Sequence, residues 1–452
     1  MKKLSGWQNC TLLAPEIRSG AARIASAFTA AGFQLFLVGG AVRDIVSGKR
    51  PEDVDLLTTA TPDEAAEIFP EIKLTGASFG VMRLKEGGTT FEIASAREER
   101  NYMDGRHPGE IRCTRDPDVD AMRRDFTINA MRLDPLSGEL FDPAGGLEDL
   151  RRGIIRTVGD PEKRFKEDYL RMLRAIRFAA KTGFELEEKT FDALCKFSFL
   201  AAELAGERIR EELTRILTGK HPDRALRLLL ETGLLKAVLP EAAALSGVTQ
   251  PPEYHPEGDV FEHICLMFKH MAYPDPQLAW SVLLHDIGKP VTRSVEPGGR
   301  IRFFCHEERG AEMVREIAER LHFSLHDRES IARAVRNHMR MASVREMKTA
   351  KLKKLMADDN FSLELELHRL DCISCHSFMD TFVFLTDKLC CEPDPALPPR
   401  WVMGKDLVKA GVPPSPAFKT VLEETFDRQL SGEFNTPEEA LIFALNQLQE
   451  RK

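Results

Sequence analysis

The sequence lacks any apolar run of the roughly 18 residues that a membrane-spanning helix requires. Its N-terminal stretch, MKKLSGWQNC, has two lysines but no apolar core of an export signal. We therefore expect a cytoplasmic protein with no membrane partner. At 452 residues the chain is longer than one hydrophobic core usually serves, so several domains are expected. No feature of the sequence predicts an oligomeric state.

Cysteines are few and scattered. Their number, nine, is odd, which suits reduced cytosolic thiols better than a disulfide framework. Cys372 and Cys375 form one C-x-x-C pair, and Cys390 and Cys391 are adjacent. Because no second pair follows at zinc-finger spacing, we do not expect a structural zinc site.

The chain also lacks a general excess of basic residues, since its formal net charge is −8. This argues against a protein whose whole surface is basic and binds nucleic acid. Residues 151–181 are an exception, with ten Lys/Arg against four Asp/Glu. A phosphate backbone is expected to bind there, if anywhere.

Hydrophobic patterning predicts a mixed N-terminal region followed by helices. We expect helices over 11–32 and 62–69, the second capped by Thr61, and strands over 33–38, 52–58, 80–84, 90–95 and 129–141. From about residue 160 the pattern is almost wholly helical, and Asp160 and Gly183 bound a helix that carries EDYLRMLRAIRFAAK. With too few β–α alternations for a doubly wound sheet, the expected class is α+β followed by all-α domains.

Proline and glycine clusters suggest the domain boundaries. They lie at 247–258 and 391–399, and such segments commonly link domains. The expected parts cover 1–150, 151–245, 246–390 and a helical tail, 391–452.

The first candidate site begins at a glycine turn. Gly39-Gly40 follows an apolar strand and precedes Arg43 and Asp44; such a turn exposes backbone N–H groups to phosphate. In RPEDVDLLT, Asp53 and Asp55 are expected on one face of a strand, where two carboxylates repel unless a cation such as Mg²⁺ lies between them. The alternative is an edge strand with solvated charges.

Further residues strengthen the cation hypothesis. Glu92, flanked by apolar residues, is expected to complete the carboxylate set, and Arg123-Arg124-Asp125 leads into FTINAM, which contains Asn129. Residues 98–118 are expected to form a long polar loop that closes over a substrate.

These motifs resemble a known family. LVGGAVRD, EDVDLLT, RRDFTINAM, RFKEDYLRMLRAIRFAAKTGF and ERIREEL are similar, in this order, to motifs of bacterial tRNA nucleotidyltransferases, the CCA-adding group related to bacterial poly(A) polymerases. The resemblance implies a polymerase-beta-like nucleotidyltransferase head and a helical neck. It also implies that Asp53 and Asp55 bind two Mg²⁺ ions for in-line transfer of a nucleotide, with release of pyrophosphate. The nucleotide-binding residues implied are Gly39, Gly40, Arg43, Asp44, Arg124, Asp125, Asn129, Asp168, Arg171, Arg174 and Arg177.

Two of these residues are expected to select the base. Asp168 and Arg171 are three residues apart and would share one helical face. On their own they would suggest an ion pair, whereas the resemblance implies that they hydrogen-bond the Watson–Crick edge of CTP or ATP. Arg174 and Arg177 continue the row, either reaching phosphate or facing solvent.

A second metal site is expected in the region 246–390. Its candidate ligands are His263, His285, Asp286, His306, His338 and Asp371, a pattern that resembles HD phosphohydrolase domains. Mixed nitrogen and oxygen ligands favour a transition metal such as Mn²⁺, Ni²⁺, Co²⁺ or Fe²⁺. Lys289 would neutralise substrate charge. The alternative is an HD fold that binds RNA and has lost its catalytic activity.

Three functions follow from the resemblance. The leading one is addition of CCA to tRNA from CTP and ATP, with phosphohydrolysis as a second activity. A narrower one is addition of A alone or of poly(A), although the acid-rich tail after residue 400 disfavours poly(A) and the intact DGRHP disfavours an enzyme limited to CC. The third is a metal-dependent HD phosphohydrolase whose N-terminal half binds tRNA; both carboxylates it would lack, Asp53 and Asp55, are present.

Overall fold

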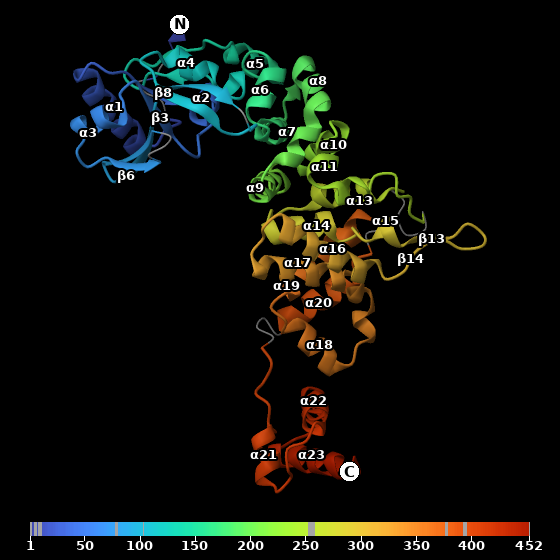
Figure 1. Cartoon of the computed structure of the whole chain (residues 1–452). Coiled ribbons are helices and arrows are strands. Elements are labelled where there is room, and N and C mark those ends of the chain that lie inside the picture. Colours follow the sequence, from blue (N-terminus) through green and yellow to red (C-terminus); the bar gives the residue numbers. More distant parts are fainter. Residues whose placement is uncertain are drawn as a thin grey trace. The chain divides into compact units, whose positions relative to one another are not determined.

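The chain forms two compact units. The computed structural model describes residues 2–3, 7, 11–76, 80–102, 104–251, 258–375, 378–391 and 396–451. One unit covers 1–243 and the other covers 244–452 (Figure 1). The first is α+β, and the described part of the second is helical apart from one short hairpin. The expected fold class is therefore confirmed, while the finer division into four parts stays a prediction.

An eight-stranded mixed sheet organises the first unit. Its order is β1-β10-β9-β2-β3-β6-β5-β4. Strand β3 pairs antiparallel with β2 and parallel with β6, and Leu37, Leu56 and Ile93 from these three central strands are fully buried. The strands are β1 (Lys2–Lys3), β2 (Leu35–Val38), β3 (Asp55–Thr58), β4 (Lys73–Gly76), β5 (Val81–Glu86), β6 (Thr89–Ser95), β9 (Arg132–Leu133) and β10 (Glu139–Phe141).

Helices pack against the sheet, and the chain after β10 is mainly helical. Helix α1 packs against β2 and β6, and Thr61 caps α3 with Glu64 as expected. A short parallel pair, β11 (Ile154–Ile155) and β12 (Glu185–Leu186), joins the later helices. The helices are α1 (Pro15–Ala30), α2 (Gly40–Val46), α3 (Pro62–Ile68), α4 (Pro117–Met122), η2 (Thr127–Asn129), α5 (Gly146–Arg152), α6 (Pro161–Glu167), α7 (Leu170–Thr182), α8 (Glu188–Phe197), η3 (Ser198–Glu203), α9 (Gly206–Leu217), α10 (Pro222–Glu231), α11 (Leu234–Val238) and α12 (Pro240–Ala243).

Two expected elements are wrong in the first unit. The strand predicted over 129–141 is instead a turn of helix, η2, and the hairpin β9–β10, because Asp134 accepts the backbone N–H of Gly138 (φ 71°) and reverses the chain. The polar loop predicted over 98–118 is largely a second hairpin, β7 (Arg97–Tyr102) and β8 (Pro108–Cys113), followed by α4.

A third expected element is also wrong, because Asp168 and Arg171 do not lie on one continuous helix. Helix α6 ends before Asp168, whose backbone is extended (φ −143°, ψ 107°), and α7 begins at Leu170. The N–H of Tyr169 donates to the carbonyl of Gly105 at 2.9 Å, which ties the break to the β7–β8 hairpin. The outer ends of the two helices follow the prediction, with Asp160 capping α6 and Gly183 (φ 78°) ending α7.

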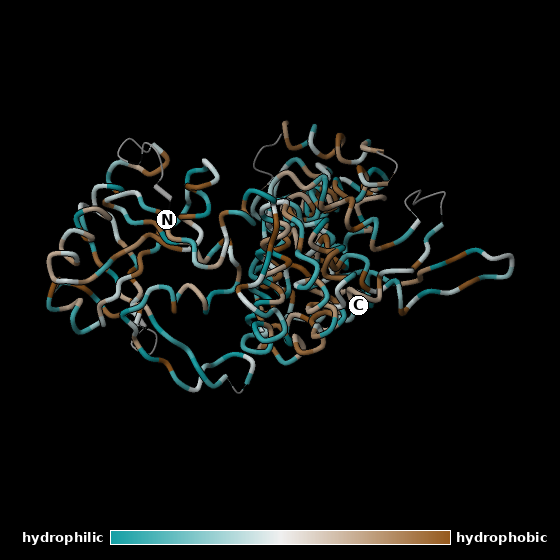
Figure 2. Tube along the Cα trace, turned by 90° about the horizontal axis from the view of Figure 1, so that it is seen from above, coloured by the Kyte–Doolittle hydropathy of each residue, from teal (hydrophilic) through white to brown (hydrophobic). Residues whose placement is uncertain are grey.

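The second unit is built from packed helices. Hydrophobic and hydrophilic stretches alternate along the chain (Figure 2), as amphipathic helices around a core require. No helix of the described residues is long and apolar enough to cross a membrane. The elements are α13 (Val260–His270), α14 (Pro276–Leu284), α15 (Lys289–Thr292), β13 (Arg293–Val295), β14 (Ile301–Phe303), α16 (His306–Arg320), α17 (Leu325–Asn337), η4 (His338–Glu346), α18 (Thr349–Met356), α19 (Phe361–Ser374), α20 (Asp380–Cys391), α21 (Gly404–Lys409), α22 (Ala417–Leu430) and α23 (Pro437–Glu450).

Candidate active site and candidate metal centre

The glycine turn after β2 forms one wall of a cavity. Gly39 has φ 67° and ψ −134°, a conformation that favours glycine. Four residues on, the buried guanidinium of Arg43 donates to Asp44 Oδ1 and Asn129 Oδ1, each at 2.9 Å. The turn is thus fixed to the residues that follow it and to FTINAM.

The two aspartates lie where β3 begins. Asp55 is the first residue of the strand and Asp53 precedes it, so the pair is not carried on one strand as expected. Burial raises the pKa of Asp55, nearby Glu92 and Asp53 raise it further, and Arg124 opposes them. Because like charges gather here at an energetic cost, the position fits a divalent cation.

Glu92 is less well placed for the role expected of it. It is the register partner of Asp55 on the neighbouring strand β6, but its carboxylate accepts from Arg83 at 2.6 Å and does not line the cavity. Among the described residues, Asp53, Asp55 and Glu92 do not form a set with ligand atoms within 4.8 Å of one another. Glu92 as a third metal ligand stays a prediction.

The cavity, about 740 Å³, brings most of the expected site residues together. Arg177 does not line it and pairs with Glu212 at 2.9 Å. Tyr102 and Arg208, which the sequence did not place among the nucleotide-binding residues, also line it. The expected residues that line the cavity are Gly39, Gly40, Arg43, Asp44, Asp53, Asp55, Arg124, Asp125, Asn129, Asp168, Arg171 and Arg174.

Asp125 anchors the helix α7 to the head. Its Oδ2 accepts from Arg174 Nε at 2.9 Å and from Nη2 at 2.6 Å. Burial would raise the pKa of Asp125, but Arg174, Asn129 and the N–H of Phe126 outweigh it and hold the pKa below its ordinary value. The guanidinium of Arg174 is therefore bound to the Asp125 carboxylate, and its expected contact with phosphate stays a prediction.

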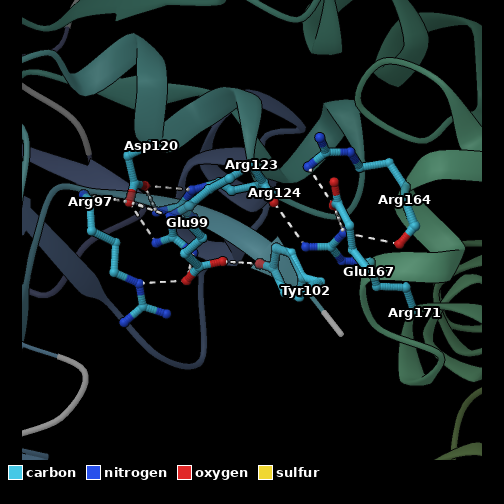
Figure 3. A network of polar contacts seen from close by, with 9 residues as sticks. All are labelled: Arg97, Glu99, Tyr102, Asp120, Arg123, Arg124, Arg164, Glu167 and Arg171. Atoms are coloured by element: carbon cyan, nitrogen blue, oxygen red, sulfur yellow. Dashed lines mark hydrogen bonds and ion pairs between the residues drawn. The ribbon is translucent and has the colours of Figure 1, made fainter. Parts of the chain in front are cut away.

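Arg171 is held on several sides (Figure 3). Its Nη1 donates to Glu167 Oε2 at 2.7 Å and to the carbonyl of Arg164 at 3.0 Å, while Nη2 donates to the carbonyl of Arg123 at 3.0 Å. Asp168 lies 3.4 Å from Arg208. The two expected base readers therefore share the cavity without pairing with each other in the contacts described.

A network of ion pairs and hydrogen bonds links the β7–β8 hairpin to Arg123, whose carbonyl accepts from Arg171 (Figure 3). Tyr102 donates its hydroxyl to Glu99, which also pairs with Arg123 at 3.0 Å. Burial would raise the pKa of Glu99, but Arg123, Tyr102 and Arg97 lower it. Arg123 in turn binds the fully buried Asp120. The hairpin is thus fixed to α4 through side chains that a hydrophobic pattern does not reveal.

The second unit gathers its predicted ligands in one place. Asp286 lies 3.1 Å from His285, 3.4 Å from His306 and 3.8 Å from His338, and His263 lies 3.1 Å from Asp371. Ligand atoms of His263, His285 and Asp286, and separately of Asp286, His306 and His338, lie within 4.8 Å of one another.

The imidazole orientations fit a metal ion. The Nδ1 atoms of His285, His306 and His338 lie 2.9, 2.9 and 2.6 Å from backbone carbonyls, which leaves each Nε2 to act as a ligand. Burial and the neighbouring His285 lower the pKa of His338 to about 3, so its imidazole is neutral. Burial would raise the pKa of Asp286, but His285 and Lys289 hold it well below its ordinary value.

Comparison with known proteins agrees with this organisation. Residues 35–156 match the "Poly A polymerase head domain" family, 183–245 match "Probable RNA and SrmB- binding site of polymerase A", and 260–364 match the "HD domain" family. The resemblance to the tRNA nucleotidyltransferases is confirmed. The head carries the glycine turn and the aspartates, and the HD domain carries the histidine cluster except Asp371.

Individual relatives that match this chain are named CCA-adding enzymes. The chain is 43% identical over 208 residues to a CCA-adding enzyme of Lactobacillus helveticus, covering 46% of this chain and 52% of that protein. It is 42% identical over 203 residues to one of Geobacillus sp., covering 45% and 50%. These alignments span about half the length of the curated relatives.

Solved structures share the fold. The Bacillus stearothermophilus CCA-adding enzyme in complex with CTP is 26% identical, with a TM-score of 0.75 over 97% of this chain and 99% of that one. The Thermotoga maritima CCA-adding enzyme complexed with tRNA is 21% identical, with a TM-score of 0.64 over 99% of each chain. At that lower identity the second likeness concerns the fold alone.

Proposed function

We propose that this protein adds CCA to the 3′ end of tRNA from CTP and ATP, without a nucleic-acid template, and releases pyrophosphate. The observation that carries the proposal is the 740 Å³ cavity. It has an acidic pair at the glycine turn and, on other elements of the same unit, an aspartate and an arginine able to read a base. The CTP-bound relative supports this choice of nucleotide.

The head residues would hold the triphosphate and the reacting oxygens. Backbone N–H groups at Gly39 and Gly40 offer donors to phosphate, and Arg43, fixed by Asn129, adds positive charge beside them. Asp53 and Asp55 would hold divalent metal ions, for which Mg²⁺ suits the carboxylate ligands. Bound there, the metal stabilises the charge that develops on the attacking and leaving oxygens.

Asp168 and Arg171 would select the base by hydrogen-bond polarity. Cytosine and adenine both present an amine donor beside a ring-nitrogen acceptor, whereas uracil and guanine reverse this order. A carboxylate accepts from the amine and a guanidinium donates to the ring nitrogen. Both side chains line the cavity, and the contacts of Arg171 with Glu167 and two carbonyls pre-orient its guanidinium.

The tRNA would meet the basic stretch 151–181 and the region 183–245, whose family description names RNA binding. An A-only or poly(A)-adding activity is the narrower alternative. The cytoplasmic location expected from the sequence stays a prediction.

As a second function, we infer metal-dependent phosphohydrolysis at the histidine cluster. The observation in its favour is the set of buried imidazoles whose Nε2 atoms face Asp286. One or two metal ions, for which Mn²⁺, Ni²⁺, Co²⁺ or Fe²⁺ are the candidates, would bind His263, His285, Asp286, His306, His338 and Asp371. Lys289, 2.7 Å from Asp286, would offset substrate charge.

Paired variants test both functions. Asp53→Ala should lower the rate of nucleotide addition by at least about 10³-fold and leave the metal content of the second unit unchanged. His285→Ala should lower the metal content of the second unit and leave the rate of nucleotide addition unchanged. Asp63→Asn, an exposed carboxylate on α3, is the matched control for the head. If either variant removed both properties while the protein stayed folded, the assignment of two separate sites would be wrong.

A further inference from the structure

A cysteine lies beside the histidine cluster, in the second unit. Cys375 follows the end of α19, four residues after Asp371, so the two side chains project from the same side of the last turn. Its Sγ lies 3.6 Å from Nδ1 of His263 and 3.7 Å from Oδ1 of Asp371. Ligand atoms of these three residues all lie within 4.8 Å of one another.

The separations have the size expected between ligands of one ion. With metal–nitrogen and metal–oxygen bonds of about 2.1 Å and a metal–sulfur bond of about 2.3 Å, tetrahedral geometry places sulfur about 3.6 Å from each of the other two atoms. Both measured distances from Sγ are close to this value, and the other ring nitrogen of His263, Nε2, lies 3.1 Å from Oδ1 of Asp371. His263 is fully buried, so its imidazole is held within the histidine cluster.

We propose that Cys375 is a thiolate ligand of a metal ion held by His263 and Asp371. This compartment adjoins the one formed by Asp286, His306 and His338, which has only nitrogen and oxygen ligands, and a third cluster, His263, His285 and Asp286, connects the two. The sulfur–metal bond forms as the thiol releases its proton to solvent, with no change in oxidation state. The proposal rests on metal binding by this cluster and is independent of nucleotide addition in the other unit.

A thiolate changes which ions the site prefers. Sulfur ligands favour Zn²⁺, Co²⁺ and Fe²⁺ over Mg²⁺ and Mn²⁺. The softer ion would then bind next to Cys375, and an ion with only nitrogen and oxygen ligands would bind next to His306 and His338.

The neighbouring thiol supplies a matched control. Cys372 lies in the last turn of α19, three residues before Cys375, and its Sγ is 3.5 Å from Nε2 of His368. It belongs to none of the three ligand clusters found among the described residues. A cysteine that only orients His263, without bonding the metal, is the competing role for Cys375.

The test is cobalt substitution in the full-length protein. After removal of metal with a chelator, Co²⁺ is titrated into the native protein, Cys375→Ser and Cys372→Ser, with bound cobalt measured directly. We expect sulfur-to-cobalt charge-transfer absorption in the native protein and in Cys372→Ser. In Cys375→Ser it should be absent, with Co²⁺ affinity lower by at least about tenfold.

Each other outcome overturns the proposal. Cobalt bound without charge-transfer absorption, or the same absorption in Cys375→Ser, would exclude the thiolate ligand, and failure to bind cobalt would exclude the compartment. If Cys375→Ser does not fold, alkylation of the native protein decides the matter, because Zn²⁺ should protect Cys375 at least tenfold and leave Cys372 unprotected. Retained nucleotide addition in each variant would report that the head is intact.

Discussion

Glu167 sets the orientation of the proposed base reader, and its substitution gives the sharpest test of that role. In the structure its Oε2 accepts from Arg171 at 2.7 Å and from Arg164 at 3.0 Å. Glu167→Gln keeps the shape and one acceptor but removes the charge. The Arg171 guanidinium stays charged, so the glutamine still accepts a charge-assisted hydrogen bond but loses the ion-pair attraction. Because hydrogen bonds to charged groups span about 1.5–3 kcal/mol, the substitution should weaken the restraint on Arg171 by up to about 1.4 kcal/mol.

That loss corresponds to up to about tenfold in an equilibrium. We expect the preference for CTP and ATP over UTP and GTP, measured as the ratio of kcat/KM values on tRNA transcripts, to fall by up to about tenfold in Glu167→Gln. The metal-dependent step should be affected less, because Glu167 does not line the cavity.

A control on the same helix isolates the effect. Glu162 pairs with Lys196 at 2.7 Å on the surface of the first unit, with both side chains substantially exposed. Glu162→Gln should leave nucleotide preference unchanged, because exposed ion pairs contribute little. An unchanged preference in folded Glu167→Gln, or the same loss in Glu162→Gln, would refute the positioning role.

Three further predictions concern the head. Asp55→Asn should abolish addition yet raise Tm in metal-free buffer at pH 7, because the raised pKa of Asp55 means that its charge destabilises the fold above that pKa; a lower Tm would contradict this. Arg174→Met should lower the free energy of unfolding by about 1–3 kcal/mol at pH 7, because it leaves the buried carboxylate of Asp125 without its main donor. Denaturation at several pH values should show this deficit closing only below about pH 4, as pH falls through the lowered pKa of Asp125, because the ion pair stabilises only while the carboxylate is charged. Gly39→Ala and Gly32→Ala both place alanine at positive φ, and each should cost about 1–2 kcal/mol of stability. Only Gly39→Ala should raise KM for CTP. Equal effects of the two substitutions on KM would exclude a role for the glycine turn in binding nucleotide.

The sequence predicted most of the buried framework because local signals and burial agree there. The strands before Gly39 and around Glu92 have apolar residues with strand periodicity, and both are present. Caps at Thr61 and Asp160 follow from short-range hydrogen bonds. The histidine cluster could be predicted because each ligand type is rare in an apolar helix and the resemblance gave their order.

The errors share one physical cause, since they depend on contacts between distant residues. The β7–β8 hairpin is rich in charged residues, among them Arg100 and Glu98, paired at 2.6 Å, so no hydrophobic alternation marks it. The break at Asp168 is fixed by a hydrogen bond from Tyr169 to Gly105, which helical periodicity within EDYLR cannot reveal.

Site geometry was harder to predict than site membership. Arg174 and Arg177 both continue the helical row, yet Arg174 reaches Asp125 in the cavity while Arg177 pairs with Glu212 outside it. The position of a carboxylate on a neighbouring element decides between these outcomes. The C-x-x-C spacing of Cys372 and Cys375 likewise did not indicate that Cys375 lies beside the histidine cluster, because His263 and Asp371 become its neighbours only when α13 packs against α19.

The most direct test of the central claim is stepwise nucleotide addition with Mg²⁺ and three tRNA transcripts, lacking CCA, ending in C or ending in CC. Each receives CTP, ATP or both, with products resolved to single nucleotides. We predict that both nucleotides together restore CCA and then stop on every transcript, and that ATP alone extends only the CC-ended one, by a single A. Long A tracts, extension of the CC-ended transcript alone when CTP and ATP are both present, or no addition would contradict assignment as a CCA-adding enzyme.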